Sequence, residues 1–109
     1  MGSQAEDLAL HYLLQRNLTL ITRNYRCRCG EIDLILQDND TLVFAEVRKR
    51  GSENFGGAAA SIDQRKQTKL IRTAQHYLQH LKQIPPCRFD AILLNSNNHI
   101  EWVKNAFGA

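Results

Sequence analysis

The sequence predicts one α/β domain in which a mixed β-sheet is flanked by helices. Two segments repeat apolar residues at the spacing of a helix, and five shorter segments are apolar and β-rich or alternate in polarity. Their order along the chain is α-β-β-β-α-β-β. The 109 residues, of which 43% are hydrophobic and 23% charged, suffice for a single core, so we expect one globular domain over residues 1–109.

The first helix is expected over residues 4–15 and the first strand over residues 18–23. Ser3 followed three residues later by Glu6 is the capping-box pattern, in which both side chains satisfy backbone N–H groups. The apolar stripe at helical spacing consists of Ala5, Leu8, Ala9, Tyr12 and Leu13. A capping role therefore explains Glu6 without any catalysis.

The next two strands are predicted to form a hairpin around the polar segment 37–41. A two-residue loop at Asn39-Asp40 suits a type I′ turn. This register places Asp38 opposite Thr41, Ile35 opposite Phe44, Asp33 opposite Glu46, and Glu31 opposite Arg48. Alternation then puts these last four charged residues on one face, and on the other face the apolar residues Ile32, Leu34, Val43, Ala45 and Val47.

The facing carboxylates of Asp33 and Glu46 indicate a metal site. Like charges placed opposite each other destabilise a sheet, and a divalent cation would neutralise them. Mg²⁺ fits because it takes one or two carboxylates, keeps several waters and contacts substrate phosphate. The alternative is a solvated polar face in which Arg48 pairs with Glu46, and spacing alone leaves both interpretations open.

The second half of the chain predicts a loop, a helix and two closing strands. Residues 51–57 are rich in glycine and polar side chains, which is typical of a loop. Ser61 is expected to begin the helix with Gln64 at the capping-box position, and Pro85-Pro86 blocks any further helix. The strands are expected over residues 89–94 and 100–103. The apolar stripe of the helix consists of Leu70, Ile71, Ala74, Tyr77, Leu78 and Leu81.

The basic residues predict a polyanionic partner. The net charge is +3 and the pI is 8.9, and the charges gather before the hairpin, at its end and in the second helix. We expect a nucleic-acid track formed by Arg48, Lys49, Arg50 and Lys66. Lys66 lies beside the buried stripe of its helix, where a snorkelling surface lysine is the alternative.

Other features exclude several classes of protein. No apolar run is long enough to cross a membrane, and no secretory pattern is present. The three cysteines form no disulfide framework, which favours a reducing cytoplasm. His76 and His80 lack a third ligand, and Cys27-x-Cys29 lacks a second pair, so neither is predicted as a metal site.

Five motifs occur together in a recognisable order: Ala5-Glu6-x-x-Ala9-x-x-Tyr12-Leu13, Gly30-Glu31-Ile32-Asp33-Leu34-Ile35, Phe44-x-Glu46-Val47, Lys66 before an alanine-containing helix, and Arg88-Phe89-Asp90. With these motifs the chain resembles the YraN-like family of small bacterial proteins. That family is placed in the PD-(D/E)XK nuclease superfamily and is closest in layout to archaeal Holliday-junction resolvases. The resemblance implies a restriction-endonuclease-like αβββαβ core and a homodimer.

The resemblance also implies roles for individual residues. Asp33 and Glu46 would be ligands of Mg²⁺ or Mn²⁺, and Glu6 would help complete the acidic site. The superfamily has a lysine two residues after the second acid, where this chain has Arg48. Arginine stays protonated and cannot act as a base, but its planar fork binds phosphate well. The expected catalytic set is therefore Glu6, Asp33, Glu46 and Arg48.

Three functions follow from these observations. The first is a metal-dependent nuclease that acts on phosphodiester bonds of DNA. The second is a non-catalytic nucleic-acid-binding module whose site degenerated when arginine replaced the motif lysine. The third is a protein-interaction domain whose acidic hairpin is merely solvated.

Overall fold

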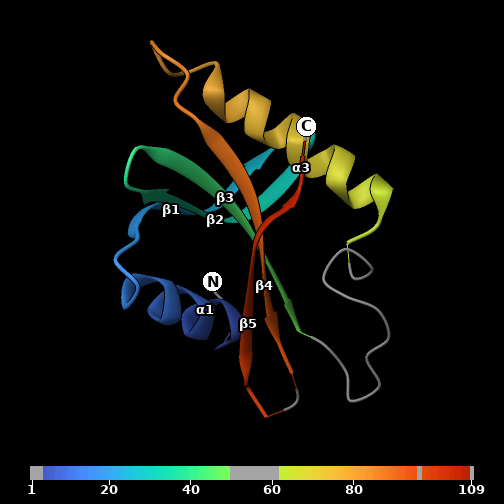
Figure 1. Cartoon of the computed structure of the whole chain (residues 1–109). Helices are drawn as coiled ribbons and strands as arrows, with labels where there is room; N and C mark the ends of the chain where they lie inside the picture. Colours follow the sequence, from blue (N-terminus) through green and yellow to red (C-terminus); the bar gives the residue numbers. More distant parts are fainter. Residues whose placement is uncertain (1–3, 50–61, 96, 109) are drawn as a thin grey trace.

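The computed structural model describes residues 4–49, 62–95 and 97–108, and these form a five-stranded sheet between two helices (Figure 1). Ser3, Arg50, the expected loop 51–57 and Ser61 lie outside the described residues. The elements are α1 (Gln4–Leu14), β1 (Thr19–Cys27), β2 (Gly30–Asp38), β3 (Thr41–Lys49), α3 (Gln64–Leu78), β4 (Cys87–Leu94) and β5 (Ile100–Phe107). The predicted α/β class and the αβββαβ core are confirmed. No helix in these ranges is both long and apolar enough to span a membrane.

The sheet is mixed, with the strand order β1-β2-β3-β4-β5. Neighbouring strands are antiparallel except for β3 and β4, which are parallel. A parallel connection needs a crossover, and α3 lies in the chain between these two strands. The C-terminal end of β3 and the first turns of α3 consequently lie close together, and both contribute to the pocket described below.

Both faces of the sheet are buried, each by one helix. On the α1 side, Leu34, Val43 and Ile92 pack with Ala9 and Leu13. On the α3 side, the sheet packs against a cluster formed by Ile35, Phe44, Leu93, Leu70 and Ala74. Burial on both faces explains why β2, β3 and β4 contain nearly continuous apolar runs instead of strict alternation.

The predicted hairpin register is confirmed where β2 and β3 pair. Ile35 lies opposite Phe44, and Asp38 lies opposite Thr41. The turn is not type I′, because that turn needs a positive φ at both central residues and only Asn39, at 56°, has one. The ladder ends at Leu34 and Ala45, so neither of the next two expected strand pairings, Asp33 with Glu46 and Glu31 with Arg48, is present.

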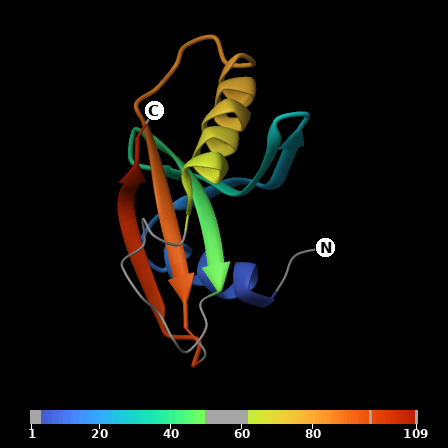
Figure 2. The same ribbon diagram turned by 90° about the vertical axis from the view of Figure 1, so that its right-hand side faces the viewer.

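β1 extends further than predicted, to Cys27, and its far end, paired with the start of β2, curls toward α3 (Figure 2). Asn24 has a φ of 53°, which interrupts the alternation of β1. Arg23 bonds to α1 through Asp7, whereas the hydroxyl of Tyr25 lies 2.6 Å from Nδ1 of His76 in α3. Ile32 pairs with Tyr25 and packs on the α3 side, so the expectation that it shares a face with Leu34 is wrong.

The second helix and the last strand also differ in their bounds from the prediction. Gln64 is the first residue of α3 and does not occupy the capping-box position. The N-cap is Asp63, whose Oδ1 accepts the N–H of Lys66 at 2.8 Å. The final strand continues to Phe107, well past the expected end at residue 103. The cap fixes the first turns of α3, which supply most of the basic side chains at the candidate site.

Candidate functional site

Asp33 lies just beyond the point where β2 and β3 stop pairing, and its side chain accepts a backbone N–H of β3 that no longer has a partner in the ladder. Its Oδ2 accepts the N–H of Val47 at 2.9 Å. This bond satisfies a backbone donor that the ladder leaves open. It also holds the carboxyl group of Asp33 against β3, beside Glu46, so the structure brings together the two predicted metal ligands.

Glu46 is the most unusual group in the described part of the chain. Its side chain is only 6% exposed, and Oε1 is buried without a hydrogen-bond partner. Oε2 lies 3.5 Å from Nζ of Lys66 and 3.7 Å from NH1 of Arg48. Leaving a buried polar atom unpaired costs about 1–3 kcal/mol. An acceptor that stays open at this cost is typical of a site that binds something.

Burial and the neighbouring carboxyl group of Asp33 raise the cost of ionising Glu46. Burial, and then the negative charge of Asp33, raise the pKa of Glu46 to about 7, against the opposing effect of the Lys66 and Arg48 charges. Burial also raises the pKa of Asp33, against the bond from Val47. Desolvated, mutually repelling carboxylates of this kind are concentrated at functional sites. A bound cation would remove the repulsion.

The donor set fits a hard divalent cation that keeps most of its own waters. Within residues 4–49, 62–95 and 97–108, no three His, Cys, Asp or Glu side chains are grouped to enclose a metal ion. Asp33 and Glu46 are therefore the two acidic side chains that the described residues offer to a metal ion here. Two carboxylates suit Mg²⁺, which seldom occupies an all-protein cage.

Glu6 belongs to a polar network next to the pair. Its Oε1 accepts NH2 of Arg23 at 3.2 Å. In the orientation that its neighbours dictate, the amide nitrogen of Asn24 donates to both Glu6 and Glu31, each at 3.1 Å. Glu31 also accepts Nε of Arg26 at 3.1 Å. The network connects α1 to the strand that carries Asp33 and stabilises that strand against the helix.

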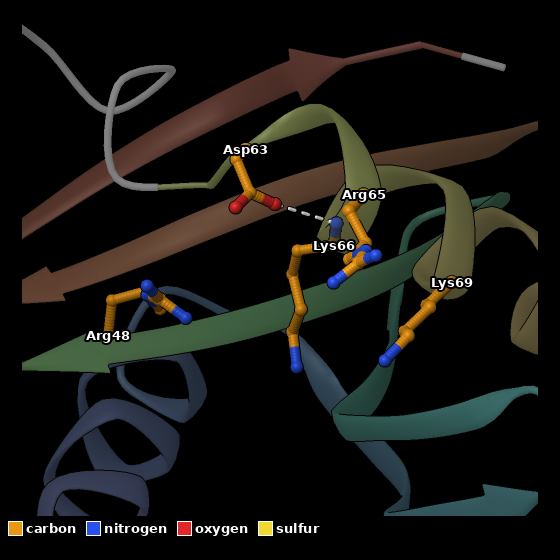
Figure 3. A pocket seen from close by; sticks show the side chains of 5 residues that line it. All are labelled: Arg48, Asp63, Arg65, Lys66 and Lys69. Carbon is orange, nitrogen blue, oxygen red and sulfur yellow. Dashed lines mark hydrogen bonds between the residues drawn. The ribbon is translucent and has the colours of Figure 1, made fainter.

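A basic pocket opens beside the carboxylate pair (Figure 3). Its volume is about 230 Å³, and the described residues that line it are all charged: Arg48, Asp63, Arg65, Lys66 and Lys69. Arg48 comes from the end of β3, and the others come from the N-cap and first turns of α3. Figure 3 shows the Lys66 and Lys69 side chains extending from the helix toward the sheet. Lys66 thus contributes both to the pocket and to the surroundings of Glu46.

Sequence reasoning placed some of these residues and missed others. Arg48 and Lys66, both predicted from the sequence as site residues, line the pocket. Lys49, which was also predicted, is exposed at the end of β3 and does not line it. Arg65 and Lys69 were not predicted as site residues. Lys69 lies four positions after Arg65 and three after Lys66, a spacing that could have suggested a shared helix face.

A second buried carboxylate, Asp90, provides a contrast with Glu46. Its Oδ1 accepts Nε of Arg88 at 2.9 Å and the N–H of Asn105 at 3.0 Å. Its Oδ2 accepts the indole N–H of Trp102 at 2.9 Å and NH2 of Arg88 at 3.0 Å. The contacts with Trp102 and Asn105 join β4 to β5, and those with Arg88 lie within β4. Asp90 therefore has a structural role, which also explains the Arg88-Phe89-Asp90 motif.

The fold and the site define a small α/β protein with a buried carboxylate pair beneath a cationic pocket. Residues 5–94 match the uncharacterised protein family UPF0102, and the chain belongs to this family. A UPF0102 protein of Nitrosomonas eutropha is 59% identical over 106 residues, which cover 97% of this chain and 91% of that protein. A relative from Methylobacillus flagellatus is 53% identical over 111 residues, covering 100% of this chain and 97% of the relative. Membership of a family of small bacterial proteins is thereby confirmed, and the nuclease superfamily stays a prediction.

Proposed function

We propose that this protein is a metal-dependent nuclease that cleaves phosphodiester bonds of DNA. The observation that carries the proposal is the open, buried Oε1 of Glu46 beside Asp33, with the ammonium of Lys66 3.5 Å from the other oxygen. An acidic pair next to concentrated positive charge is suited to a metal ion and a phosphate group at the same place. The resemblance to PD-(D/E)XK nucleases supports the same chemistry.

In this proposal the acidic residues would bind the metal ion and the basic residues would bind phosphate. Asp33 and Glu46 would hold Mg²⁺ or Mn²⁺, which when bound stabilises negative charge on phosphate and lowers the pKa of a bound water. The bond from Val47 fixes Oδ2 of Asp33 and orients the carboxylate before any metal arrives. Arg48 would bind a phosphate oxygen with its fork.

Lys66 would take the role of the lysine that the superfamily places two residues after the second acid. A lysine ammonium is a compact charge with three rotatable donors, so it can position a water molecule or a phosphate oxygen. Its Nζ lies slightly nearer to Glu46 than the guanidinium of Arg48 does. Glu6 would act indirectly, by stabilising the strand that carries Asp33 through Asn24 and Glu31.

A non-catalytic nucleic-acid-binding module is the second candidate. It is favoured by the two cations within 4 Å of Oε2 of Glu46, since they offset much of the carboxylate charge without a metal. In that case the basic pocket would bind a nucleic-acid backbone, and the acidic pair would only organise Lys66 and Arg48.

Cleavage of linear, nicked and branched DNA, with and without Mg²⁺ or Mn²⁺, tests the proposal. We expect metal-dependent cleavage that Asp33→Asn and Glu46→Gln each abolish, while Lys82→Gln, far along the chain from the site, leaves it intact. If the natural protein binds these DNAs but cleaves none of them with either metal, the binding module replaces the nuclease. If it neither binds nor cleaves DNA, the protein-interaction domain replaces both.

A further inference from the structure

The basic pocket contains more positive charge than the carboxylate pair requires. Lys66 and Arg48 contact Glu46, but Arg65 and Lys69 have no ion-pair partner in the part of the chain that the structure describes. Both residues are exposed and are held close to Lys66 by the first turns of α3. Cations crowded in this way repel one another unless an anion joins them.

Asp63, the one acid among the described lining residues, does not neutralise these cations. The side chain of Asp63 is committed to capping α3, because its Oδ1 accepts the N–H of Lys66 at 2.8 Å. In the described part of the lining, one carboxylate therefore faces four cationic side chains. The pocket volume of about 230 Å³ is several times the roughly 30 Å³ that one water molecule occupies in the liquid, so the space admits a polyatomic anion.

We infer that this pocket binds a backbone phosphodiester group adjacent to the one held at the carboxylate pair, which makes a polynucleotide strand the substrate class. The inference that a neighbouring phosphodiester group lies at the carboxylate pair rests on the proposed function. Lys66 connects the two places, because it lines the pocket and its Nζ lies 3.5 Å from Glu46. A mononucleotide or free phosphate would fill only one of them.

The lining indicates recognition of the backbone and not of the bases. Among the described residues that line the pocket, every side chain is charged and none is aromatic or otherwise suited to stack on a base. Arginine forks and lysine ammonium groups bind phosphate oxygens, and such contacts position a nucleic acid without reading its sequence. The pocket therefore predicts binding with little sequence preference.

The test compares the variant Arg65→Gln/Lys69→Gln with a matched control, Arg16→Gln/Lys82→Gln, which removes the same charge from exposed sites outside the pocket. Binding of a single-stranded oligothymidylate is measured by fluorescence anisotropy in EDTA over a range of salt concentrations. Loss of one phosphate contact should reduce the slope of log K against log salt by about 0.7 in the pocket variant. The control should keep the slope of the natural protein.

Three outcomes would overturn the inference: an unchanged slope in the pocket variant, an equal reduction in the control, or thymidine 5′-monophosphate binding as tightly as the oligonucleotide. Circular dichroism of both variants verifies that they are folded. Because the measurement uses no metal and no cleavage, it is independent of the proposed function. If the protein does not cleave DNA but the two variants still differ in slope, the nuclease proposal is wrong and the phosphate site stands. If the protein cleaves DNA but the slopes do not differ, the nuclease proposal stands and the phosphate site is wrong.

Discussion

Nζ of Lys66 lies 3.5 Å from Oε2 of Glu46, although the two residues belong to different elements, α3 and β3. Arg48 stands only two positions from Glu46 on the same strand, and its NH1 lies at 3.7 Å. The helix therefore supplies the ammonium group that the strand lacks. This arrangement separates the roles of the two cations and makes them testable one at a time.

Replacing Lys66 should damage cleavage more than replacing Arg48. Loss of one preorganised charged donor next to the reacting group is expected to lower kcat roughly 100-fold or more in Lys66→Gln. Arg48→Gln removes a phosphate contact and should cost about tenfold in kcat/KM. Single-turnover cleavage measures both, with Lys82→Gln as the control. A gain of cleavage in Arg48→Lys would instead assign the role of the missing lysine to position 48.

Mg²⁺ or Mn²⁺ should perturb the backbone near the carboxylate pair. The amide of Val47 is bonded to Oδ2 of Asp33, so its chemical shift reports directly on that carboxylate. Titration followed by NMR should move the signals of Val47 and Glu46 together at one apparent Kd. The double variant Asp33→Ala/Glu46→Ala should show no such shifts, while Asp40→Asn in the distant turn keeps them. Shifts that survive in the double variant would rule out this metal site.

Without metal, the protein should lose stability as the pH rises toward neutrality. The pKa of Glu46 is raised from 4.5 to about 7, so between these values the folded state binds more protons than the unfolded state. The free energy of unfolding should consequently fall by about 1–3 kcal/mol as the pH rises through 7, the opposite of an ordinary paired carboxylate. Urea unfolding from pH 5 to 8 measures this change.

Glu46→Gln is the control for that pH dependence. Its side chain cannot ionise, so its stability should change less over the same range, and at pH 8 it should exceed that of the natural protein. Addition of Mg²⁺ at pH 8 should stabilise the natural protein, because ligand binding to the folded state adds to the free energy of unfolding. It should leave Glu46→Gln nearly unchanged. Parallel pH profiles for the two proteins would contradict the buried, raised pKa.

Asp90 should be required for the fold and not for metal binding. It is fully buried and accepts bonds from Arg88, Trp102 and Asn105. Asp90→Ala should destabilise the protein by about 3–5 kcal/mol, because it leaves a guanidinium without its buried partner. Asp38 offers a matched control, since it also pairs with Arg88, at 2.9 Å, but is more exposed. Asp38→Ala should cost about 1 kcal/mol in urea unfolding, and an equal loss in both variants would contradict this difference.

Local patterns predicted most of the fold correctly. The apolar spacing of α1 and the polar segment between β2 and β3 led to the right elements, and the register that joins Ile35 to Phe44 followed from the turn. The extension of β1 from residue 23 to Cys27 was missed because Arg23, Asn24 and Arg26 are not typical strand residues. The φ of 53° at Asn24, a backbone property that no side-chain pattern reveals, accompanies the change of face between Arg23, which bonds to α1, and Tyr25, which contacts α3.

The site was less predictable because it depends on contacts between distant segments. The proximity of Asp33 and Glu46 followed from the predicted hairpin. The sequence did not show that the β2–β3 ladder ends just before these two residues, so Glu31 was wrongly expected as the partner of Arg48, which contacts Glu46 instead. The distance from Lys66 to Glu46 is determined by the crossover of α3 between parallel strands. Neither Arg50 nor the homodimer implied by the resemblance is tested by the described residues.

The hydrogen bond between Asp33 and Val47 needs only an acceptor oxygen at position 33, so a variant can keep the fold and still lose the proposed metal site. An asparagine at position 33 would still offer a carbonyl oxygen to the Val47 N–H while losing the negative charge that the proposed metal ion would need. Such a chain would fold, express and resist heat much like its parent. Screens that select variants by solubility or melting temperature would pass it unnoticed, so inactive descendants could accumulate in the family without any sign of structural damage.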